Sequence, residues 1–453
     1  MFLLRKKSNL IKIALVIVLL IFFFLRFYLI QQRLLFGWDQ ARDAQVVSQV
    51  LSGKPTLIGP RVLGPDKFFL GPYFYYLLTP FYLITRGSPT AMIWFLICYN
   101  LMFAGLFWLI IKKIFSTKAA FFSLLLWALN PSFIKNDIIS WNPVLVPLIV
   151  IITWYWCYLA LKRENGFIWL LLGLTLGLGV NFHFQIIFLI CFVVLFFWLN
   201  KQVLSLKKVF LSMVGFLVSF SPLFLFDLRH NFLNSQLLIK FFTAQQTNKE
   251  AMAWLPVLNN FVQGFTGISL SPVLILTFFL LFTAALFVKG KKSQQSLIGS
   301  FYQASAGLFI VSLIGFSYYG VRPSEYYFNY LAPFIIVFLT SLLSKRNWGQ
   351  VLLVTIGLFW FGISLNKINP IPFSLINKTS AVKYLTQRFN QEKVNVAFSV
   401  PLSEDTSYIY LIEQAGYKID SSAGPQYTIV VPPEKEEITV IIAGIGLVLP
   451  EEE

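Results

Sequence analysis

The chain has 453 residues, of which 57% are hydrophobic and 12% are charged, and its formal net charge is +17. Soluble domains contain about 45–50% apolar and about 25% charged residues, so this composition excludes an ordinary soluble protein and indicates a polytopic membrane protein. The basic residues stand in short clusters between apolar runs rather than on one face, which excludes nucleic acid as the expected partner and favours a lipid bilayer.

The N-terminal segment is basic and then strongly apolar. Arg5, Lys6 and Lys7 precede an apolar run from Ile11 to Ile30, which is long enough to cross a bilayer. No small-residue cleavage site follows this run. We therefore expect an uncleaved signal anchor with a cytoplasmic N-terminus.

A polar island follows this first run. Residues 37–44 bring Asp39, Arg42 and Asp43 together just where the first span should end. Ionisable groups are costly at a bilayer boundary, so their presence suggests function before structure. Asp39 is therefore the first candidate for chemistry.

The island opens the first external loop, residues 31–87. Gly and Pro at short intervals divide this loop into stiff pieces. One short helix is expected over residues 40–52. A second, aromatic-rich helix is expected over residues 72–85; it contains Tyr75, is too short to span, and suits the membrane interface.

Basic clusters recur in every second loop, as the positive-inside rule requires of cytoplasmic loops. Fitting spans between them gives about eleven crossings, with the tail after residue 366 outside the cell. Residues 166–200 are expected to form a hairpin of two short helices with Asn181 and His183 at its outer apex. The predicted fold class is an all-α polytopic membrane protein.

The carboxylates of the membrane part are few and uneven. Only eight precede residue 370, and this topology places seven of them outside: Asp39, Asp43, Asp66, Asp137, Asp227, Glu250 and Glu325. Acids contribute little to the positive-inside rule, so their asymmetry is an independent observation that points to an extracytoplasmic site.

Later external loops carry compact polar motifs. Asp137 precedes Ser140-Trp141-Asn142-Pro143, and Asp227 precedes Arg229 and His230. A third loop contains Arg322, Glu325 and a group of tyrosines. Together with the first loop they are expected to line one cavity.

The chain after residue 365 has a different composition, with seven basic and eleven acidic residues and no span-length apolar run. We therefore divide the chain into a membrane domain, residues 1–365, and a small extracytoplasmic α/β domain, residues 366–453. A capped helix is expected from Ser403 to Gly416. Runs rich in β-branched residues predict strands at 394–400, 427–431 and 439–449.

The three cysteines all fall in apolar runs, so no disulfide or metal framework is expected: Cys98, Cys157 and Cys191.

The first external loop has a leading Asp, an Arg three positions later, a Ser-Gly step, a Gly-Pro, and a helix that begins Pro-Tyr-x-Tyr-Tyr. In these features it resembles the GT-C glycosyltransferases of the protein O-mannosyltransferase and aminoarabinose transferase type. The layout is similar over roughly residues 1–350 and most specific over residues 37–86. This resemblance implies transfer of a sugar from a polyprenyl-phosphate carrier to an acceptor on the non-cytoplasmic side.

By the same resemblance, Asp39 is the leading loop carboxylate and Arg42 the arginine that holds the carrier phosphate. Many relatives have Asp-Glu where this chain has Asp39-Gln40, so the second acid of the pair is missing. Asp43, or Asp137 in the next external loop, is expected to compensate. Some relatives begin the second loop helix with Glu-Lys-Pro, where this chain has Leu70-Gly71-Pro72. Their metal contacts at that point are therefore not carried over. A divalent cation is an open alternative, and no metal ligand is assigned.

Displacing a lipid phosphate from an anomeric carbon needs a base and a cationic clamp. Asp39 is the expected base; Arg42, with Arg229 or Arg322, is the expected clamp, because the planar guanidinium binds phosphate bidentately. If Asp39 only accepts a proton, the reaction inverts the anomeric centre.

Each candidate has a plainer alternative. Arg42 either binds phosphate or pairs with Asp39 or Asp43, and Asp137 is either a second acid or a structural hydrogen-bonding group. Asp227 is expected to form a structural ion pair with Arg229. His230 is a further candidate, for a donor pocket, and Glu325 is one for contact with an acceptor. The tyrosines that follow Glu325 are expected to be membrane anchors, as interfacial tyrosines usually are. The substrate-binding candidates are Tyr75, Arg42, Asp43, Arg229, His230, Arg322 and Glu325.

The sequence thus predicts an inverting glycosyltransferase of the plasma membrane, with a polyprenyl-phosphate sugar donor and a protein, lipid or glycan as acceptor. A transporter or flippase of lipid-linked saccharide is a second interpretation, less natural because no midplane charge or repeat is visible. A polymerase or ligase of surface polysaccharide is a third.

Overall fold

The structure is a computed structural model of the chain. It describes residues 2–62, 67–202, 204–244, 254–266, 268, 270–292, 296–317, 324–433 and 438–450.

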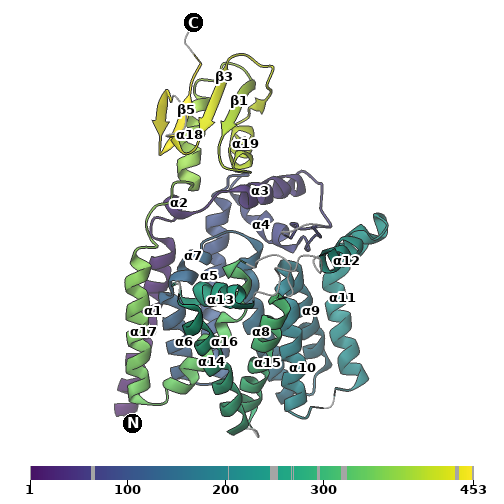
Figure 1. Cartoon of the computed structure of the whole chain (residues 1–453), viewed down its shortest axis with the longest axis vertical. Coiled ribbons are helices and arrows are strands. Elements are labelled where there is room, and N and C mark those ends of the chain that lie inside the picture. Colours follow the sequence, from purple (N-terminus) through teal and green to yellow (C-terminus); the bar gives the residue numbers. More distant parts are fainter. Residues whose placement is uncertain are drawn as a thin grey trace.

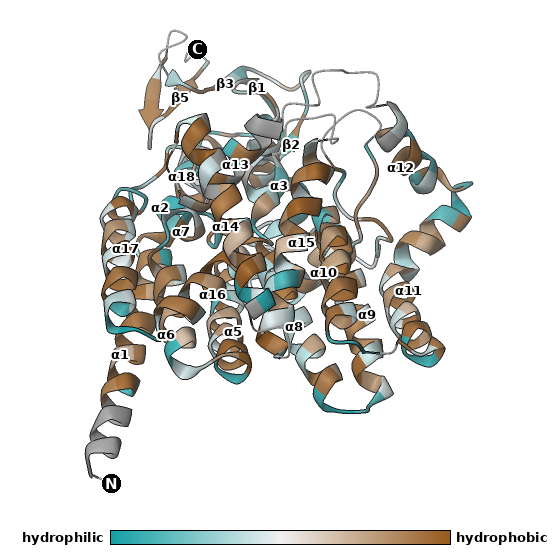
Figure 2. Ribbon diagram, turned by 60° about the horizontal axis from the view of Figure 1, so that its bottom comes forward, coloured by the Kyte–Doolittle hydropathy of each residue, from teal (hydrophilic) through white to brown (hydrophobic). Residues whose placement is uncertain are grey.

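Most of the described chain is a bundle of apolar helices (Figures 1 and 2). Among the described residues, seven helices are long and apolar enough to cross a membrane: α1 Phe2–Phe27, α5 Ala91–Ile114, α8 Val146–Lys162 with the preceding turn η1 Asn142–Leu145, α11 Leu206–Arg229, α14 Pro272–Lys292, α15 Leu297–Ser317 and α17 Asn347–Leu365. Four more in the same ranges are apolar but shorter: α6 Thr117–Leu129, α9 Gly166–Phe182, α10 Ile187–Leu199 with η2 Phe184–Ile186 before it, and α16 Ala332–Leu343. The prediction of a mostly helical, multi-span membrane protein is confirmed.

Polar residues at the ends of the apolar runs set the helix boundaries. Ser116, Asn165 and Ser205 each accept a backbone N–H bond as the N-cap of α6, α9 and α11 respectively. Lys112 and Lys113 occupy the last turn of α5, where cations complement the helix dipole. These helix ends therefore coincide with polar loops of the sequence.

Small residues bring α9 and α11 into close contact. A Cβ added to Gly173 would lie 1.8 Å from the Ser212 carbonyl oxygen, and one added to Gly215 would lie 2.1 Å from that of Leu170. Such contacts let two helix backbones pack directly in a membrane. The expected hairpin of residues 166–200 is present as α9 and α10, with His183 at the turn between them.

Short helices occupy the end of the bundle nearest the C-terminal sheet (Figure 1): α2 Ile30–Arg33, α3 Trp38–Leu51, α4 Tyr73–Ile84 and α12 Leu233–Ala244. Helices α3 and α4 confirm the two helices expected in the first loop. Further short elements are α7 Pro131–Asn136, α13 Trp254–Thr266 and η5 Glu325–Phe328. Helices α12 and α13 were not predicted from the sequence.

The first loop forms backbone hydrogen bonds within itself and with the helix bundle. Two stretches between α3 and α4 pair through Gly59 N to Leu70 O at 2.7 Å and Leu70 N to Pro60 O at 2.9 Å. Gly71 N then donates to the Asn181 carbonyl at 3.2 Å, and a Cβ on Gly71 would lie only 1.8 Å from Asn181 Oδ1. The loop therefore rests against the turn of the α9–α10 hairpin.

The described C-terminal part forms a five-stranded sheet in the order β2-β1-β3-β5-β4, with β1 parallel to β2 and β3 and the other pairs antiparallel. The strands are β1 Lys393–Ser399, β2 Lys418–Ile419, β3 Gln426–Val430, β4 Val440–Ile442 and β5 Ile445–Val448, and the helices are α18 Leu375–Thr386 and α19 Asp405–Gln414. The three expected strand regions are confirmed, the last being a β4–β5 hairpin. The expected Ser403 cap is wrong: Glu404 is the N-cap, without a side-chain cap bond, and Ser403 has φ 67°.

Backbone bonds join this sheet unit to the segment between α1 and α3. Ile371 N donates to Gln32 O, and Leu375 N to Leu34 O, each at 2.9 Å. Residues 371–375 therefore run beside the segment that leads into α3.

Candidate functional site

Helix α3 begins at a glycine and places the polar island on its first turn. Gly37 is extended, its N–H donates to Gln40 Oε1 at 3.1 Å, and its carbonyl accepts from Ala41 N at 3.0 Å. Asp39 lies in the first turn, where a carboxylate is favoured by the helix dipole.

Arg42 joins the two carboxylates of α3. Its Nη1 donates to Asp39 Oδ1 at 2.7 Å, while Nε and Nη2 donate to Asp43 Oδ1 at 2.9 and 2.6 Å. The guanidinium also lies 5.2 Å from the Trp38 ring. The salt bridge, one of the two alternatives for Arg42, is therefore present with both acids.

The two carboxylates differ in their environment. The Asp39 side chain is 42% exposed, whereas that of Asp43 is fully buried. Asp43 Oδ2 has no hydrogen-bond partner among the described residues. Asp39 is thus open to a ligand, and Asp43 holds Arg42 from the buried side.

The electrostatics follow from this difference. Burial raises the pKa of Asp43 to about 7, although Arg42 opposes the shift. Burial alone would lower the pKa of Arg42, but the Asp43 and Asp39 carboxylates outweigh it and raise that pKa. Burial, and then Asp43, raises the pKa of Tyr75, so its hydroxyl stays protonated beside the cluster.

Gln40 faces a different loop. Its Nε2 donates to the Ser140 carbonyl at 3.1 Å, and the residue is buried. This contact joins the first loop to the segment before α8. Gln40, which stands where the resemblance implies a second acid, is therefore a structural amide in this chain.

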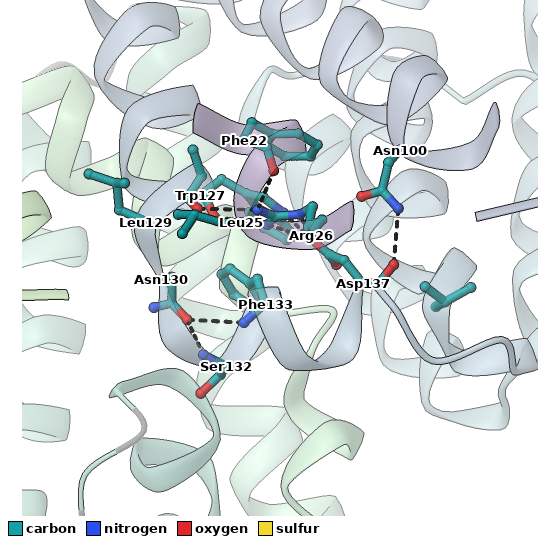
Figure 3. Close-up of polar contacts among 12 residues, drawn as sticks. Phe22, Leu25, Arg26, Asn100, Trp127, Leu129, Asn130, Ser132, Phe133 and Asp137 are labelled. Atoms are coloured by element: carbon teal, nitrogen blue, oxygen red, sulfur yellow. Dashed lines mark hydrogen bonds and ion pairs between the residues drawn. The ribbon is translucent and has the colours of Figure 1, made fainter. Parts of the chain in front are cut away.

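Asp137 lies in a buried ion pair (Figure 3). Its Oδ2 accepts from Arg26 Nη2 at 2.7 Å, from Arg26 Nε at 2.9 Å and from Trp127 Nε1 at 3.1 Å. Arg26 also donates to the carbonyls of Trp127 and Ala128, each at 3.1 Å. Within the described residues, no hydrogen bond joins Asp137 to Asp39, Arg42 or Asp43.

Arg26 is a residue that the sequence analysis missed. It is fully buried and lies in the last turn of α1, inside the first apolar run. An arginine in such a run is itself a signal, because ionisable residues in spans usually have a partner or a function. That signal could have predicted an acidic partner on a neighbouring helix.

The α11–α12 corner differs from expectation. Asp227 accepts from Asn234 N at 2.7 Å, from Ser235 N at 3.1 Å and from Ser235 Oγ at 2.6 Å. It therefore caps the start of α12, and the expected Asp227–Arg229 ion pair is wrong: a carboxylate at this position satisfies the free N–H groups of the next helix.

Arg229 and His230 both lie exposed at the end of α11. The His230 ring stacks on Phe226 at 4.1 Å, and its Nδ1 lies 2.8 Å from the Phe226 carbonyl oxygen. The other face of this corner reaches the first loop, since Phe226 packs edge-on against Phe69 at 5.6 Å. The corner is thus connected to the part of the first loop that lies just before α4.

Two candidates have no described side chain. Arg322 lies outside the described residues, and Glu325 begins η5 without a described side chain. Nor do the described residues contain a group of three or more His, Cys, Asp or Glu able to hold a metal. The cationic group that pairs with both carboxylates of α3 is the Arg42 guanidinium.

Comparison with known proteins gives the context of this geometry. Residues 70–226 match the family described as dolichyl-phosphate-mannose-protein mannosyltransferase. The solved structure of ArnT from Cupriavidus metallidurans bound to undecaprenyl phosphate is similar to this chain, with a TM-score of 0.65 and 10% identity over 97% of this chain and 98% of that one. The chain thus has the fold of ArnT, and its residues 70–226 are similar to the mannosyltransferase family.

Other solved glycosyltransferases have the same fold. ArnT of the same organism in the apo state has a TM-score of 0.52 with 11% identity, over 98% of each chain. The archaeal oligosaccharyltransferase AglB of Archaeoglobus fulgidus, in complex with an inhibitory peptide and a dolichol-phosphate, has a TM-score of 0.50 with 10% identity, over 94% of this chain and 69% of that one. No curated protein matches the sequence.

The family match has a limit that matters for the site. It begins at residue 70, so it covers Tyr75 and Asp137 but leaves Asp39, Arg42 and Asp43 outside. The α3 cluster is therefore a candidate site on its own geometry.

Proposed function

We propose that this chain is a GT-C glycosyltransferase, which transfers a sugar from a polyprenyl-phosphate donor to an acceptor on the outer face of the plasma membrane and inverts the anomeric centre. The observation that carries the proposal is the sharing of Arg42 between an exposed and a buried carboxylate. The ligands of two structurally similar proteins support the donor class: undecaprenyl phosphate in ArnT and dolichol-phosphate in AglB.

The two bonds of Arg42 have different roles in this proposal. Asp43 fixes Nε and Nη2 from the buried side, so the guanidinium keeps its orientation when a ligand binds. The Nη1 bond to Asp39 lies on the exposed side. A donor phosphate competes for this Nη1 and releases Asp39, whose carboxylate then becomes available as a base.

The chemical step needs one proton acceptor and one anion clamp. Asp39 takes the proton of the acceptor hydroxyl as that oxygen bonds to the anomeric carbon. The bond from that carbon to the phosphate oxygen breaks, and the phosphate leaves with the electron pair, held by Arg42. Arg229, His230 and Arg322 are proposed to hold the carrier phosphate, and Glu325 and Tyr75 to border the acceptor.

The proposed topology has eleven crossings, formed by the seven long and four shorter apolar helices of the described residues. The basic loops support a cytoplasmic N-terminus and an external α3 through the positive-inside rule. Residues 1–365 form the membrane domain and residues 366–453 an extracytoplasmic domain.

Asp39→Asn tests the mechanism. Purified variant and wild-type protein are incubated with a panel of radiolabelled polyprenyl-phosphate sugars, and labelled products are separated from donor. Loss of the base should lower transfer by about 10²–10⁴-fold. Asp420→Asn, which changes a carboxylate of the sheet unit, is the control and should retain full transfer; retention of transfer by Asp39→Asn would overturn the mechanism.

A labelling experiment tests the topology. The two variants are Ser52→Cys and Lys345→Cys. Ser52 follows the last residue of α3, Lys345 lies between α16 and α17, and both positions are exposed. In intact cells an impermeant thiol reagent should label the residue-52 variant and should label the residue-345 variant only after permeabilisation. The reverse pattern would place the site in the cytoplasm.

A further inference from the structure

A buried lysine of the C-terminal unit contacts the segment that leads into α3. Lys378, on α18, has a fully buried side chain. Its Nζ donates to the Phe36 carbonyl at 2.9 Å, to Ser407 Oγ at 2.7 Å and to Glu404 Oε2. Burial lowers the pKa of Lys378, while Glu404 opposes that shift.

The acidic partner of this lysine lies beside the first residue of the site. A Cβ added to Gly37 would lie 3.1 Å from Glu404 Oε1 and 3.7 Å from Gln40 Oε1. Glu404 thus directs one carboxylate oxygen to Lys378 and the other to the glycine before Trp38 and Asp39. Lys378 and Glu404 together enclose the Phe36–Gly37 step.

The surrounding contacts support a fixed arrangement at this step. Tyr410, on α19, packs against Phe36 at 5.9 Å, and its hydroxyl donates to the Gly87 carbonyl at 3.1 Å. Helix α19 lies next to α3 in the fold (Figure 1). The C-terminal unit therefore contacts the first external loop near both of its ends, at Phe36 and at Gly87.

We propose that Lys378 and Glu404 are positioning residues for catalysis, which hold the Phe36–Gly37 step and thereby orient Asp39 and Arg42 at the start of α3. This inference rests on the proposed function of the α3 cluster. Neither residue touches the substrate in this proposal; both act through the backbone on which Asp39 is mounted. Displacement of a reacting group by about 1 Å can cost about 10²-fold in rate, so a small movement of this step is sufficient.

A simpler interpretation is that the pair only docks the C-terminal unit. The two interpretations differ for a variant in which the pair is replaced by apolar residues. Removing Lys378 leaves the partly buried Glu404 carboxylate without its cation and destabilises the protein, whereas replacing both residues with apolar ones restores much of the stability. Positioning predicts that stability returns in the double variant while catalysis does not.

The experiment compares Lys378→Met, the double variant Lys378→Met/Glu404→Leu, and Glu404→Gln, which keeps an oxygen acceptor for Lys378. Lys393→Met is the matched control, because Lys393 also pairs with an acid of the sheet unit, Asp420 at 3.3 Å, but is 65% exposed. Thermal unfolding, donor KM, kcat and hydrogen–deuterium exchange are measured on full-length detergent-purified protein.

The double variant should unfold within a few degrees of wild type and yet lose about 10–100-fold in kcat, with little change in donor KM. Exchange should rise in a peptide covering the start of α3 and stay unchanged in one covering α4. Glu404→Gln should retain most of kcat, and Lys393→Met should match wild type throughout.

Wild-type kcat in a stable double variant, or unchanged exchange at the start of α3, would overturn the positioning role. The exchange measurement does not depend on transfer. If wild-type protein transferred sugar from no donor, the proposed function would fail, while increased exchange would still establish that Lys378 and Glu404 hold α3.

Discussion

Gln40 and Ser140 link the first external loop to the segment before α8 by a hydrogen bond from Gln40 Nε2 to the Ser140 carbonyl at 3.1 Å. The same amide accepts the Gly37 N–H through Oε1, also at 3.1 Å. A glutamine can donate and accept at once, whereas an ionised glutamate only accepts. The neutral side chain at position 40 therefore suits a pair of contacts that an ionised glutamate could not make.

Gln40→Glu is expected to impair the protein rather than restore a missing acid. The change removes a buried hydrogen bond and places a carboxylate against a carbonyl oxygen, at a cost of about 1–3 kcal/mol. A lower thermal midpoint and no increase in transfer should follow. Gln49→Glu, on an exposed position of the same helix, is the control; a gain in transfer by Gln40→Glu would instead identify position 40 as the place of the second acid.

Local signals in the sequence predicted much of the fold. Helices α3 and α4 were expected because Gly and Pro bound their apolar and polar runs, and the strands of the C-terminal sheet because β-branched residues cluster there. These patterns depend on neighbours a few residues apart. They indicated Asp39, Arg42 and Asp43 as one group for the same reason.

Contacts between distant segments were not predictable in this way. Arg26 meets Asp137 across 111 positions, and Lys378 meets Phe36 across 342. Such pairs depend on which helices pack together. The spacing of residues in a single sequence does not indicate this. At Asp227 a prediction from neighbouring residues was wrong. Asp227 was expected to pair with Arg229, two positions along the chain. It instead accepts hydrogen bonds from the free N–H groups at the start of α12, a helix that was not predicted.

Asp137→Ala should be strongly destabilising. The change leaves Arg26 charged, buried and without its carboxylate, and breaking a buried pair in this way costs about 3–5 kcal/mol. The double variant Arg26→Met/Asp137→Leu should recover most of the lost thermal stability. If that double variant is stable but transfers no sugar, Asp137 has a role in the chemistry beyond its ion pair; full transfer would assign it a structural role alone.

Gly71→Ala should disturb the contact between the first loop and the α9–α10 hairpin. The added methyl carbon would lie 1.8 Å from Asn181 Oδ1 and 2.7 Å from Asn181 Cβ, so the loop or the helix must move. Overpacking of this kind typically costs about 1–3 kcal/mol. The midpoint of thermal unfolding and the rate of sugar transfer should both fall. Gly362→Ala, with nothing within 4 Å of the added carbon, should leave both unchanged.

Asp43 should make the stability of the protein depend on pH. Its pKa is about 7 in the folded chain against an ordinary value of 3.8, so the folded state retains a proton that the unfolded chain releases. Stabilisation from this proton is complete below the ordinary pKa and is lost as the pH rises towards 7. Asp43→Asn keeps an oxygen acceptor for Arg42 but removes the titration, so its thermal midpoint should fall less than that of wild type from about pH 4 to about pH 7. Parallel curves for the two proteins would show that Asp43 is already ionised in the folded state, held so by Arg42.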